Sequence, residues 1–329
     1  MQTTRHIFQI ANDFKKRILT FAVIHRFLKS LITRYTYKAF GLIIDSEIEC
    51  PELIPATGNP DISISLGNIP KSLNSPLFSG VRFQTSGKEF LLSVDGIARY
   101  YVKNGNSITI EKAINANLSD VRLFLLGSAI GAIIHQRGLI PFHGSSVKIG
   151  NEAIILSGLS GAGKSTLAVA FKQKGYQLLS DDISVISFNA DGSPLTNPGF
   201  PYMKLWSDSI LKLGDNPSNY SKIRGEIGKH RFPIKNSFWD KPLPLGKIFI
   251  ISTSNLGDSK IEPIKGIEKF SMLKTHTYRF NFVVGAEMQT KHFNSFELLS
   301  KNVAVYRLIR PSGKFPFDEL IDLVLGNNG

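Results

Sequence analysis

Cysteine is nearly missing from this sequence: Cys50 is the only one in 329 residues. A single cysteine excludes a disulfide within the chain, and it excludes a zinc site built from clustered cysteines. A chain without disulfides is typical of a reducing compartment. We therefore expect a cytoplasmic protein.

Long apolar runs are also missing. The longest, residues 123–134, covers 12 positions and includes Gly127, Ser128 and Gly131, whereas a membrane-spanning helix needs about 20 apolar residues. Charged residues interrupt the first 35 positions, and no small-residue cleavage site follows them, so a secretory signal is not predicted. The run is expected to be a buried helix.

Acidic residues are scarce relative to basic ones. There are 39 Lys and Arg and 26 Asp and Glu, a net charge of +13. Residues 1–40 contain eight basic residues and one acidic residue, Asp13, so they carry +7 of this charge. Such a balance favours acidic partners such as nucleotides, nucleic acid or anionic lipid, without choosing among them.

Residues 1–36 are predicted to form a basic amphipathic helix. Apolar residues recur there at spacings of three and four with one wider step, and basic residues lie on the other faces. The apolar set is Ile7, Ile10, Phe14, Ile18, Phe21, Leu28 and Leu31. The helix can pack on its own protein or on a second subunit of a homo-oligomer. The alternative is peripheral contact with a membrane surface or an acidic partner.

Two domains are predicted after this helix. Residues 37–136 form a smaller β-rich domain with a helix at 119–135, because short alternating runs are separated by Pro, Gly, Asn and Ser turns; the runs are 42–44, 62–65, 90–92 and 108–110. Residues 137–329 form an α/β domain. Its predicted strands are 153–156, 178–179, 183–186 and 248–251, and its helices follow Lys164 and cover 317–325.

The phosphate-binding pattern G-x-x-x-x-G-K-[ST] begins at Gly158, between a predicted strand and a predicted helix. Its glycines let backbone N–H groups form a nest for phosphate at the positive end of the helix. Lys164 is expected to reach the β- and γ-phosphates, and Ser165 to coordinate magnesium. The predicted cofactors are therefore ATP and Mg²⁺, bound by Gly158, Ser160, Gly161, Ala162, Gly163, Lys164, Ser165 and Thr166.

Two carboxylates, Asp181 and Asp182, follow the next predicted strand. In a parallel α/β sheet the carboxyl ends of the strands face one crevice, so both should point at the phosphates that Lys164 binds. One can hold magnesium, and the other can accept a proton from an attacking hydroxyl. An Asp pair in a solvated loop is the ordinary alternative, and the position one helix after the phosphate-binding pattern favours catalysis.

His143 precedes the strand that leads into the phosphate-binding pattern, and taken alone it is more often structural than catalytic. Four cations are candidates to contact the transferring phosphoryl group or a peptide carboxylate. They are Arg137, Lys229, Arg231 and Arg279. A structural ion pair is the ordinary alternative for each of them.

Three anchors resemble the HPr kinase/phosphorylase family of bacterial serine kinases. In that family a His-Gly lies 21 residues before the P-loop lysine and an Asp-Asp pair begins 17 residues after it, as His143 and Asp181 do relative to Lys164. The resemblance implies a P-loop domain related to phosphoenolpyruvate carboxykinase. It also implies that Asp182 is the base and that His143 and Lys164 are its active-site partners. Ser165 is then a magnesium ligand, and Asp181 helps to hold the metal.

Shorter similarities extend over nearly the whole chain. Runs beginning at Ala39, Ser46, Leu125, His135, Tyr202 and Thr277 look like the HPr kinase-related proteins of lasso-peptide and similar peptide-maturation systems. Members of that group phosphorylate a serine, notably the C-terminal serine of a precursor peptide. The later signature of the bifunctional enzyme, with its metal-binding Glu, is not recognisable in this chain, and HPr is therefore not the favoured substrate.

Three classes of function remain. They are a serine kinase acting on a peptide or small protein, a nucleotide-binding sensor that hydrolyses little, and a kinase of a small hydroxyl compound. A sensor needs neither a base nor its partner, and a small substrate needs no long groove. The sequence therefore favours the first class, with no nucleic-acid partner.

The basic segment generates the first testable prediction. Deleting residues 1–36 should raise KM for the acceptor more than it lowers kcat, because the segment adds affinity and no chemistry. High salt should mimic the deletion by screening the same charges. The measurement is steady-state kinetics of both forms against salt concentration. A truncated protein that cannot fold would instead identify the segment as a core helix.

Overall fold

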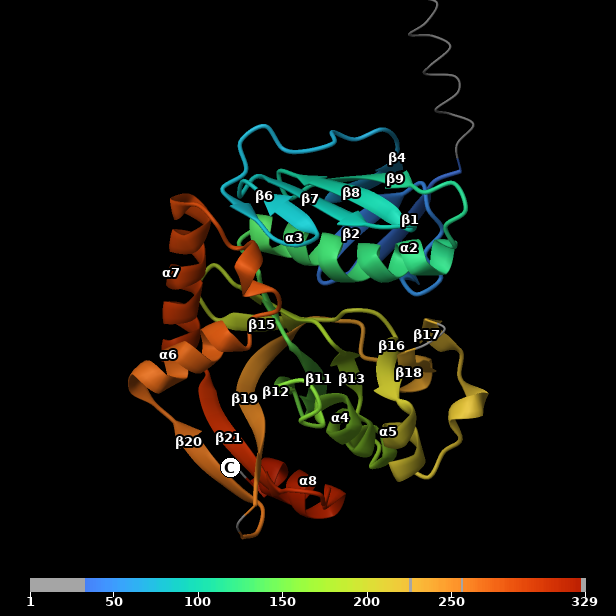
Figure 1. Ribbon diagram of the computed structural model, residues 1–329. Helices are drawn as coiled ribbons and strands as arrows, with labels where there is room; N and C mark the ends of the chain where they lie inside the picture. Colours follow the sequence, from blue (N-terminus) through green and yellow to red (C-terminus); the bar gives the residue numbers. More distant parts are fainter. Residues whose placement is uncertain (1–32, 225–226, 256, 327–329) are drawn as a thin grey trace, which may run out of the picture.

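The computed structural model describes residues 33–224, 227–255 and 257–326 (Figure 1). The predicted basic helix lies almost entirely outside this part of the chain. Strand β1 (Tyr35–Ala39) begins inside the predicted segment, and Arg34 before it donates hydrogen bonds to Asp45 and Glu47. A truncation that ends at residue 32 would leave these contacts in place.

The first unit, residues 33–136, is built on a nine-stranded sheet within the described residues, in the order β3-β1-β2-β4-β9-β8-β7-β6-β5. Buried residues alternate with exposed or half-buried ones along β4, β8 and β9, as expected for a sheet with one covered face. The strands predicted at 42–44, 62–65, 90–92 and 108–110 are confirmed. The strands after β1 are β2 (Leu42–Ser46), β3 (Ile54–Pro55), β4 (Ile62–Leu66), β5 (Phe78–Ser79), β6 (Phe83–Thr85), β7 (Glu89–Val94), β8 (Ala98–Lys103) and β9 (Ser107–Lys112).

One continuous helical segment covers this sheet. It consists of α2 (Leu118–Phe124), the π-helical turn η1 (Leu125–Ala129) and α3 (Ile130–Gln136), and it starts where the Asn117 side chain accepts a hydrogen bond from the Ser119 backbone N–H. The segment has the length and composition of a membrane span, but 67% of its most apolar window is buried inside the protein. Figure 1 shows it between the first sheet and the rest of the molecule. The predicted buried helix is confirmed.

The second unit, residues 137–326, contains a mixed sheet with the order β10-β14-β15-β19-β12-β11-β13, extended by β21 and β20. Strand β12 runs parallel to β19, and β19 runs parallel to β21. Strand β11 lies antiparallel between β12 and β13, so β12 and β13 run in the same direction. The sheet strands are β10 (Ile140–Phe142), β11 (Gly144–Ile149), β12 (Glu152–Gly158), β13 (Leu178–Ser180), β14 (Ser184–Phe188), β15 (Pro194–Asn197), β19 (Leu243–Ser254), β20 (Lys260–Ile264) and β21 (Ala304–Pro311).

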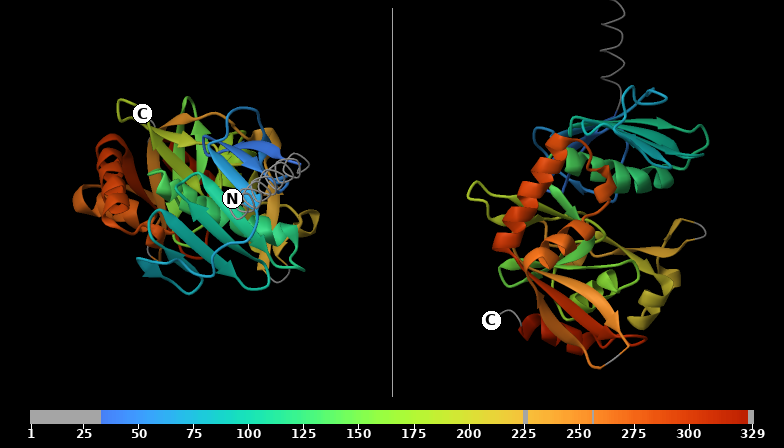
Figure 2. Two further views of the ribbon diagram at one scale, coloured as in Figure 1. Left: turned by 90° about the horizontal axis from the view of Figure 1, so that it is seen from above. Right: turned by 60° about the vertical axis from the view of Figure 1, so that its left-hand side comes forward.

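Helices cover both faces of this sheet (Figure 2). Along β12, Ile154 and Leu156 pack in one core cluster with residues of α4 and α8, whereas Ile155 packs in another cluster with residues of α6 and α7. A strand buried on both faces carries a continuous apolar run, which is why 153–156 and 248–251 could be recognised in the sequence. The helices are α4 (Lys164–Gln173), α5 (Ser207–Lys212), α6 (Gly266–Thr275), α7 (Ala286–Asn302) and α8 (Phe317–Gly326), with 3-10 turns η2 (Pro217–Asn219), η3 (Lys235–Ser237) and η4 (Phe280–Phe282).

The second unit also contains a small three-stranded sheet, on the side of α5 (Figure 1). It consists of β16 (Tyr202–Trp206), β18 (Ile227–Pro233) and β17 (Lys222–Arg224). Strands β16 and β18 pair antiparallel, so that Lys204 lies opposite Arg231 and Trp206 lies opposite Lys229. We call the β16–β18 pair the ribbon.

Two buried histidines generate a prediction about stability. His135 contacts Tyr278 O at 2.8 Å through Nε2 and His292 Nε2 at 3.2 Å through Nδ1. Burial and the neighbouring His292 lower the pKa of His135 to about 3, and burial lowers the pKa of His292 to about 4. Both rings are therefore neutral in the folded protein at pH 7.

The unfolded chain binds protons to these histidines at a higher pH than the native protein does, so stability should fall as the pH drops from about 6.5 towards 4. Each histidine contributes a slope of up to about 1.4 kcal/mol per pH unit in that window. His292→Phe keeps an aromatic ring and removes one titrating group, so its free energy of unfolding should fall less steeply. Urea unfolding of both proteins at several pH values measures this. Equal slopes would contradict it.

Candidate functional site

The phosphate-binding pattern has the predicted position between a strand and a helix. Strand β12 ends at Gly158 and helix α4 begins at Lys164. Gly161 and Gly163 adopt φ of +82° and +104°, a region that side chains rarely enter. A Cβ at Gly163 would overlap the Phe315 ring, so glycine is needed there for packing as well as for conformation.

Lys164 lies inside the turn of the loop. Its side chain is nearly buried, with 8% of the residue exposed, and Nζ donates to Gly158 O and Leu159 O at 3.0 Å each. Burial lowers the pKa of Lys164, and the nearby carboxylates of Asp181 and Asp182 oppose that shift. The ammonium is thus placed between the loop carbonyls and the acidic pair.

Asp181 connects three elements through its carboxylate. Oδ1 accepts hydrogen bonds from Ser145 Oγ at 2.6 Å and from Ser165 Oγ at 2.7 Å, and Oδ2 accepts one from the Lys204 backbone N–H at 2.9 Å. The Ser165 hydroxyl and the Asp181 carboxylate are oxygen donors of the kind that magnesium prefers. In P-loop enzymes a Ser or Thr of the loop and an acidic residue hold Mg²⁺ together with the nucleotide. The two residues fit that role.

Asp182 is held in a left-handed conformation with φ of +68°. Its Oδ2 accepts a hydrogen bond from Lys204 Nζ at 2.8 Å, and its Oδ1 lies 3.7 Å from His143 Nδ1. Removal from water disfavours the carboxylate, but the charge and hydrogen bond of Lys204, with a smaller contribution from His143 when its ring is protonated, outweigh this effect and lower the pKa of Asp182 to about 2. The side chain is therefore ionised and can accept a proton.

His143 stands beside both carboxylate and lysine. Burial and the charge of Lys164 lower the pKa of His143, so the ring is neutral at pH 7. Its Nδ1 lies 3.1 Å from Asp182 O, and a neutral ring must donate Nδ1–H to that carbonyl. This leaves Nε2 as an acceptor. The ring faces Tyr278, with centroids 5.9 Å apart.

The antiparallel strand β11 explains how these residues meet. His143 directly precedes β11, Gly158 ends β12, and Asp181 directly follows β13. Because β11 runs opposite to β12 and β13, its first residue lies at the edge where those two strands end. The cleft at this edge is lined by His143, Ser160, Gly161, Gly163, Lys164, Ser165, Thr166, Asp181, Asp182, Lys204, Leu205, Trp206, Ser209 and Lys229.

The four candidate cations separate into two groups. Lys229 lines the cleft, with Nζ 4.9 Å from the Trp206 ring centroid. The three arginines lie outside it. Arg137 pairs with Asp61, Arg231 pairs with Glu52, and Arg279 is exposed beside the ring of Tyr278.

Two residues of the site were missed in the sequence. Lys204 bonds to both aspartates and lies within a run that sequence similarity had singled out, but no spacing rule connects it to the phosphate-binding pattern. Ser145 follows His143 closely, and only the antiparallel direction of β11 reveals that its hydroxyl meets Asp181.

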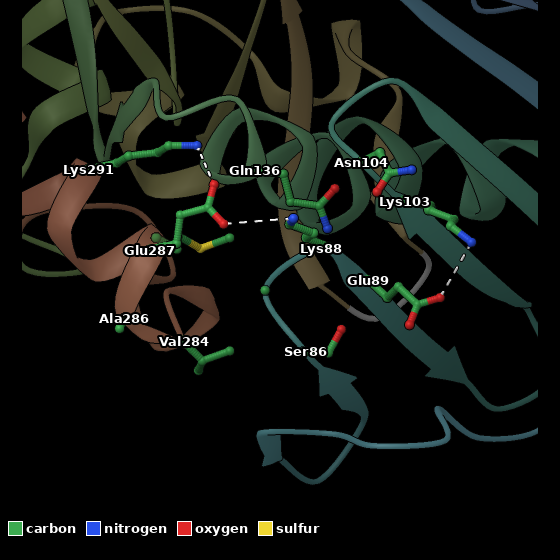
Figure 3. Close-up of a pocket in the computed structure, with 13 residues that line it drawn as sticks. Ser86, Lys88, Glu89, Lys103, Asn104, Gln136, Val284, Ala286, Glu287 and Lys291 are labelled. Carbon is green, nitrogen blue, oxygen red and sulfur yellow. Dashed lines mark hydrogen bonds and ion pairs between the residues drawn. The ribbon is translucent and has the colours of Figure 1, made fainter.

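A larger cavity lies elsewhere, between α7 and the β6–β7 and β8–β9 turns (Figure 3). Its volume is about 750 Å³, compared with about 90 Å³ for the cleft. Glu287 pairs with both Lys88 and Lys291, and Glu89 pairs with Lys103. The charges that line this cavity are thus paired with one another, and it contains none of the predicted site residues.

Comparison with known proteins adds little to this geometry. No protein-family model matches the sequence, and no curated protein sequence matches it. Among solved structures, the HPr(Ser) kinase/phosphatase from Coxiella burnetii is similar to 57% of this chain over 89% of its own, at 12% identity and a TM-score of 0.31. So low a TM-score assigns neither fold nor activity, and the functional conclusion rests on the residues of the cleft.

The loop lysine generates a prediction. Lys164→Ala should abolish phosphoryl transfer and leave thermal melting close to wild type, because the ammonium faces the cleft and not the apolar core. Lys172→Ala removes the same charge from the same helix outside the cleft and should retain activity. Transfer assays and melting curves of both variants measure this. Wild-type turnover by a normally melting Lys164→Ala protein would refute the assignment.

Proposed function

We propose that this protein binds ATP and magnesium and transfers the γ-phosphoryl group to a serine hydroxyl of a peptide or small protein. The observation that carries the proposal is the convergence of Asp182, His143 and Lys164 in one cleft beside a glycine-rich loop that opens helix α4. Binding of a nucleotide alone would need the loop and Lys164, but not an ionised carboxylate positioned by a neutral histidine.

Each residue has a distinct task in this proposal. The loop N–H groups and Lys164 bind the phosphates, while Ser165 and Asp181 hold Mg²⁺, which neutralises phosphate charge. Asp182 accepts the proton of the attacking hydroxyl, since the carboxylate is ionised and lies in the cleft. His143 fixes the orientation of Asp182 through its hydrogen bond to the backbone.

A second, smaller cavity supports a polypeptide acceptor over a small hydroxyl compound. It lies at the junction of the two units and shares Asp181 and Lys204 with the cleft. Its other walls are largely apolar and come from both units: Leu123, Leu126, Phe200, Tyr202, Met203 and Ile223, with Glu52, Arg122 and Arg231. Its volume is about 40 Å³, which leaves room for no more than a small side chain beside the acceptor serine.

The sequence similarity to lasso-peptide maturation proteins narrows the proposed acceptor to a precursor peptide, with its C-terminal serine as the phosphorylated residue. We also propose that the protein is cytoplasmic. In the same proposal, residues 1–36 contact the peptide, a second subunit or a membrane surface. The test incubates the purified protein with magnesium, ATP and the peptide encoded beside its gene. A mass increase of one phosphate on serine is expected, and unchanged peptide would count against the proposal.

The two aspartates generate a paired prediction. Asp182→Asn keeps shape but cannot accept the proton, so nucleotide affinity should stay near wild type while single-turnover transfer falls by roughly 10²–10⁴-fold, the usual contribution of a general base. Asp181→Asn should weaken magnesium binding, and its defect should partly recover at high magnesium. The measurement is single-turnover phosphoryl transfer by both variants as a function of magnesium concentration. Rescue of Asp182→Asn but not Asp181→Asn would mean that the roles are exchanged.

A further inference from the structure

The positive charge around the cleft comes from lysine. Phosphoryl transfer places charge on the oxygens of the γ-phosphoryl group, and enzymes stabilise it with a cation in addition to the loop lysine and the metal. Of the described residues that line the cleft, three are cations: Lys164, Lys204 and Lys229. None of the described arginines lines the cleft: Arg231 is engaged by Glu52, and Arg310 donates to Ala162 O of the loop at 3.2 Å from outside the cleft.

Lys204 is the cation that is hydrogen-bonded to both aspartates. Its backbone N–H donates to Asp181 Oδ2 at 2.9 Å, and its Nζ donates to Asp182 Oδ2 at 2.8 Å. The backbone bond fixes the position of β16, and the four-carbon side chain carries the ammonium from there to Asp182 through rotatable bonds. Its side chain is 26% exposed, so it reaches the cleft without being locked in the core.

Lys229 is less suited to the task. It lies above the Trp206 ring on the neighbouring strand. No hydrogen bond from its ammonium to either aspartate occurs in the described structure, whereas Lys204 already donates to Asp182 Oδ2. Lys204 is therefore the cation in direct contact with the proposed base.

We propose that Lys204 is a further catalytic residue, which moves its ammonium from Asp182 Oδ2 to an oxygen of the γ-phosphoryl group when the acceptor hydroxyl arrives. This inference rests on the proposed function. The hydroxyl oxygen forms a bond to the γ-phosphorus, the bond from that phosphorus to the β–γ bridging oxygen breaks, and ADP leaves. The hydroxyl proton goes to the carboxylate of Asp182. The movement of Lys204 brings a second lysine to the charge that develops on the phosphoryl oxygens.

Variants of the full-length protein separate this role from a purely structural one. Lys204→Met removes the ammonium and keeps an unbranched side chain, and Lys204→Arg restores a cation. Lys222→Met is the matched control, because it removes the same charge from β17 of the same small sheet, outside the cleft. Single-turnover transfer and nucleotide affinity are measured for each variant and for Asp182→Asn with and without Lys204→Met.

Lys204→Met should lower the transfer rate by roughly 10²–10³-fold, the usual loss on removing one group that stabilises transition-state charge. ATP affinity should change little, Lys204→Arg should recover part of the rate, and Lys222→Met should match wild type. If Lys204 touches the phosphoryl group, its loss should slow Asp182→Asn further. A double variant no slower than Asp182→Asn would show that Lys204 acts only through Asp182 and would overturn the proposal.

A binding experiment tests Lys204 independently of any acceptor. ADP with aluminium fluoride imitates the transferring phosphoryl group, so Lys204→Met should weaken binding of this pair by at least tenfold and leave binding of ADP alone unchanged. If Lys204→Met weakens binding of the mimic but no serine is phosphorylated, the role of Lys204 stands and the proposed serine-kinase function is wrong. Equal affinities of wild type and Lys204→Met for the mimic would overturn that role even where peptide phosphorylation succeeds.

Discussion

The carboxylate of Asp181 is the point on which the cleft depends. It accepts hydrogen bonds from the Ser145 and Ser165 hydroxyls and from the Lys204 backbone, and only 6% of the residue is exposed. A buried carboxylate is costly unless donors surround it, so each of the three elements that supply a donor is constrained by the same group. The central sheet, the helix after the phosphate-binding loop and the ribbon are thereby fixed relative to one another.

The geometry of the neighbouring Asp182 follows from that constraint. With Asp181 directed inward, the chain turns through a left-handed conformation at Asp182 and presents the second carboxylate to Lys204 and His143. Strain of this kind persists where the surrounding structure over-determines it, and it is common at functional sites. Two adjacent residues of identical chemistry thus acquire different surroundings: Asp181 accepts hydrogen bonds from three neutral donors, and Asp182 pairs with the Lys204 ammonium.

The local parts of this structure could be predicted from the sequence. Apolar runs of 153–156 and 248–251 identified strands buried on both faces, and the glycine-rich pattern located the loop between β12 and α4. Strand β11 and its direction could not be predicted, because Gly144–Ile149 carries no apolar run. Ser145 and Lys204 also escaped notice, because they join the site through tertiary contacts with Asp181. The partners of Arg137 and Arg231, Asp61 and Glu52, lie in the first unit, far away in the sequence.

The first unit reaches the cleft along two routes. Glu52, with 6% of its side chain exposed, pairs with Arg122 of α2 and with Arg231 of β18, which lies directly opposite Lys204 in the ribbon. The junction therefore fixes the strand that aligns the proposed catalytic lysine. On the second route, Gly131 of α3 leaves room for the Tyr278 ring, since a Cβ there would lie 3.1 Å from Tyr278 Cε1.

Tyr278 in turn packs against the His143 ring, and its carbonyl is bonded to the buried His135. Gly131, which interrupts the apolar run of residues 123–134, thus has a structural role beside His143, and not only in the core of the first unit. Because both routes end on side chains of the cleft, the position of the first sheet and its helix bears directly on the alignment of the site. A first unit that merely tethered a substrate would not require two arginines paired with a buried glutamate and a close-packed tyrosine at this junction.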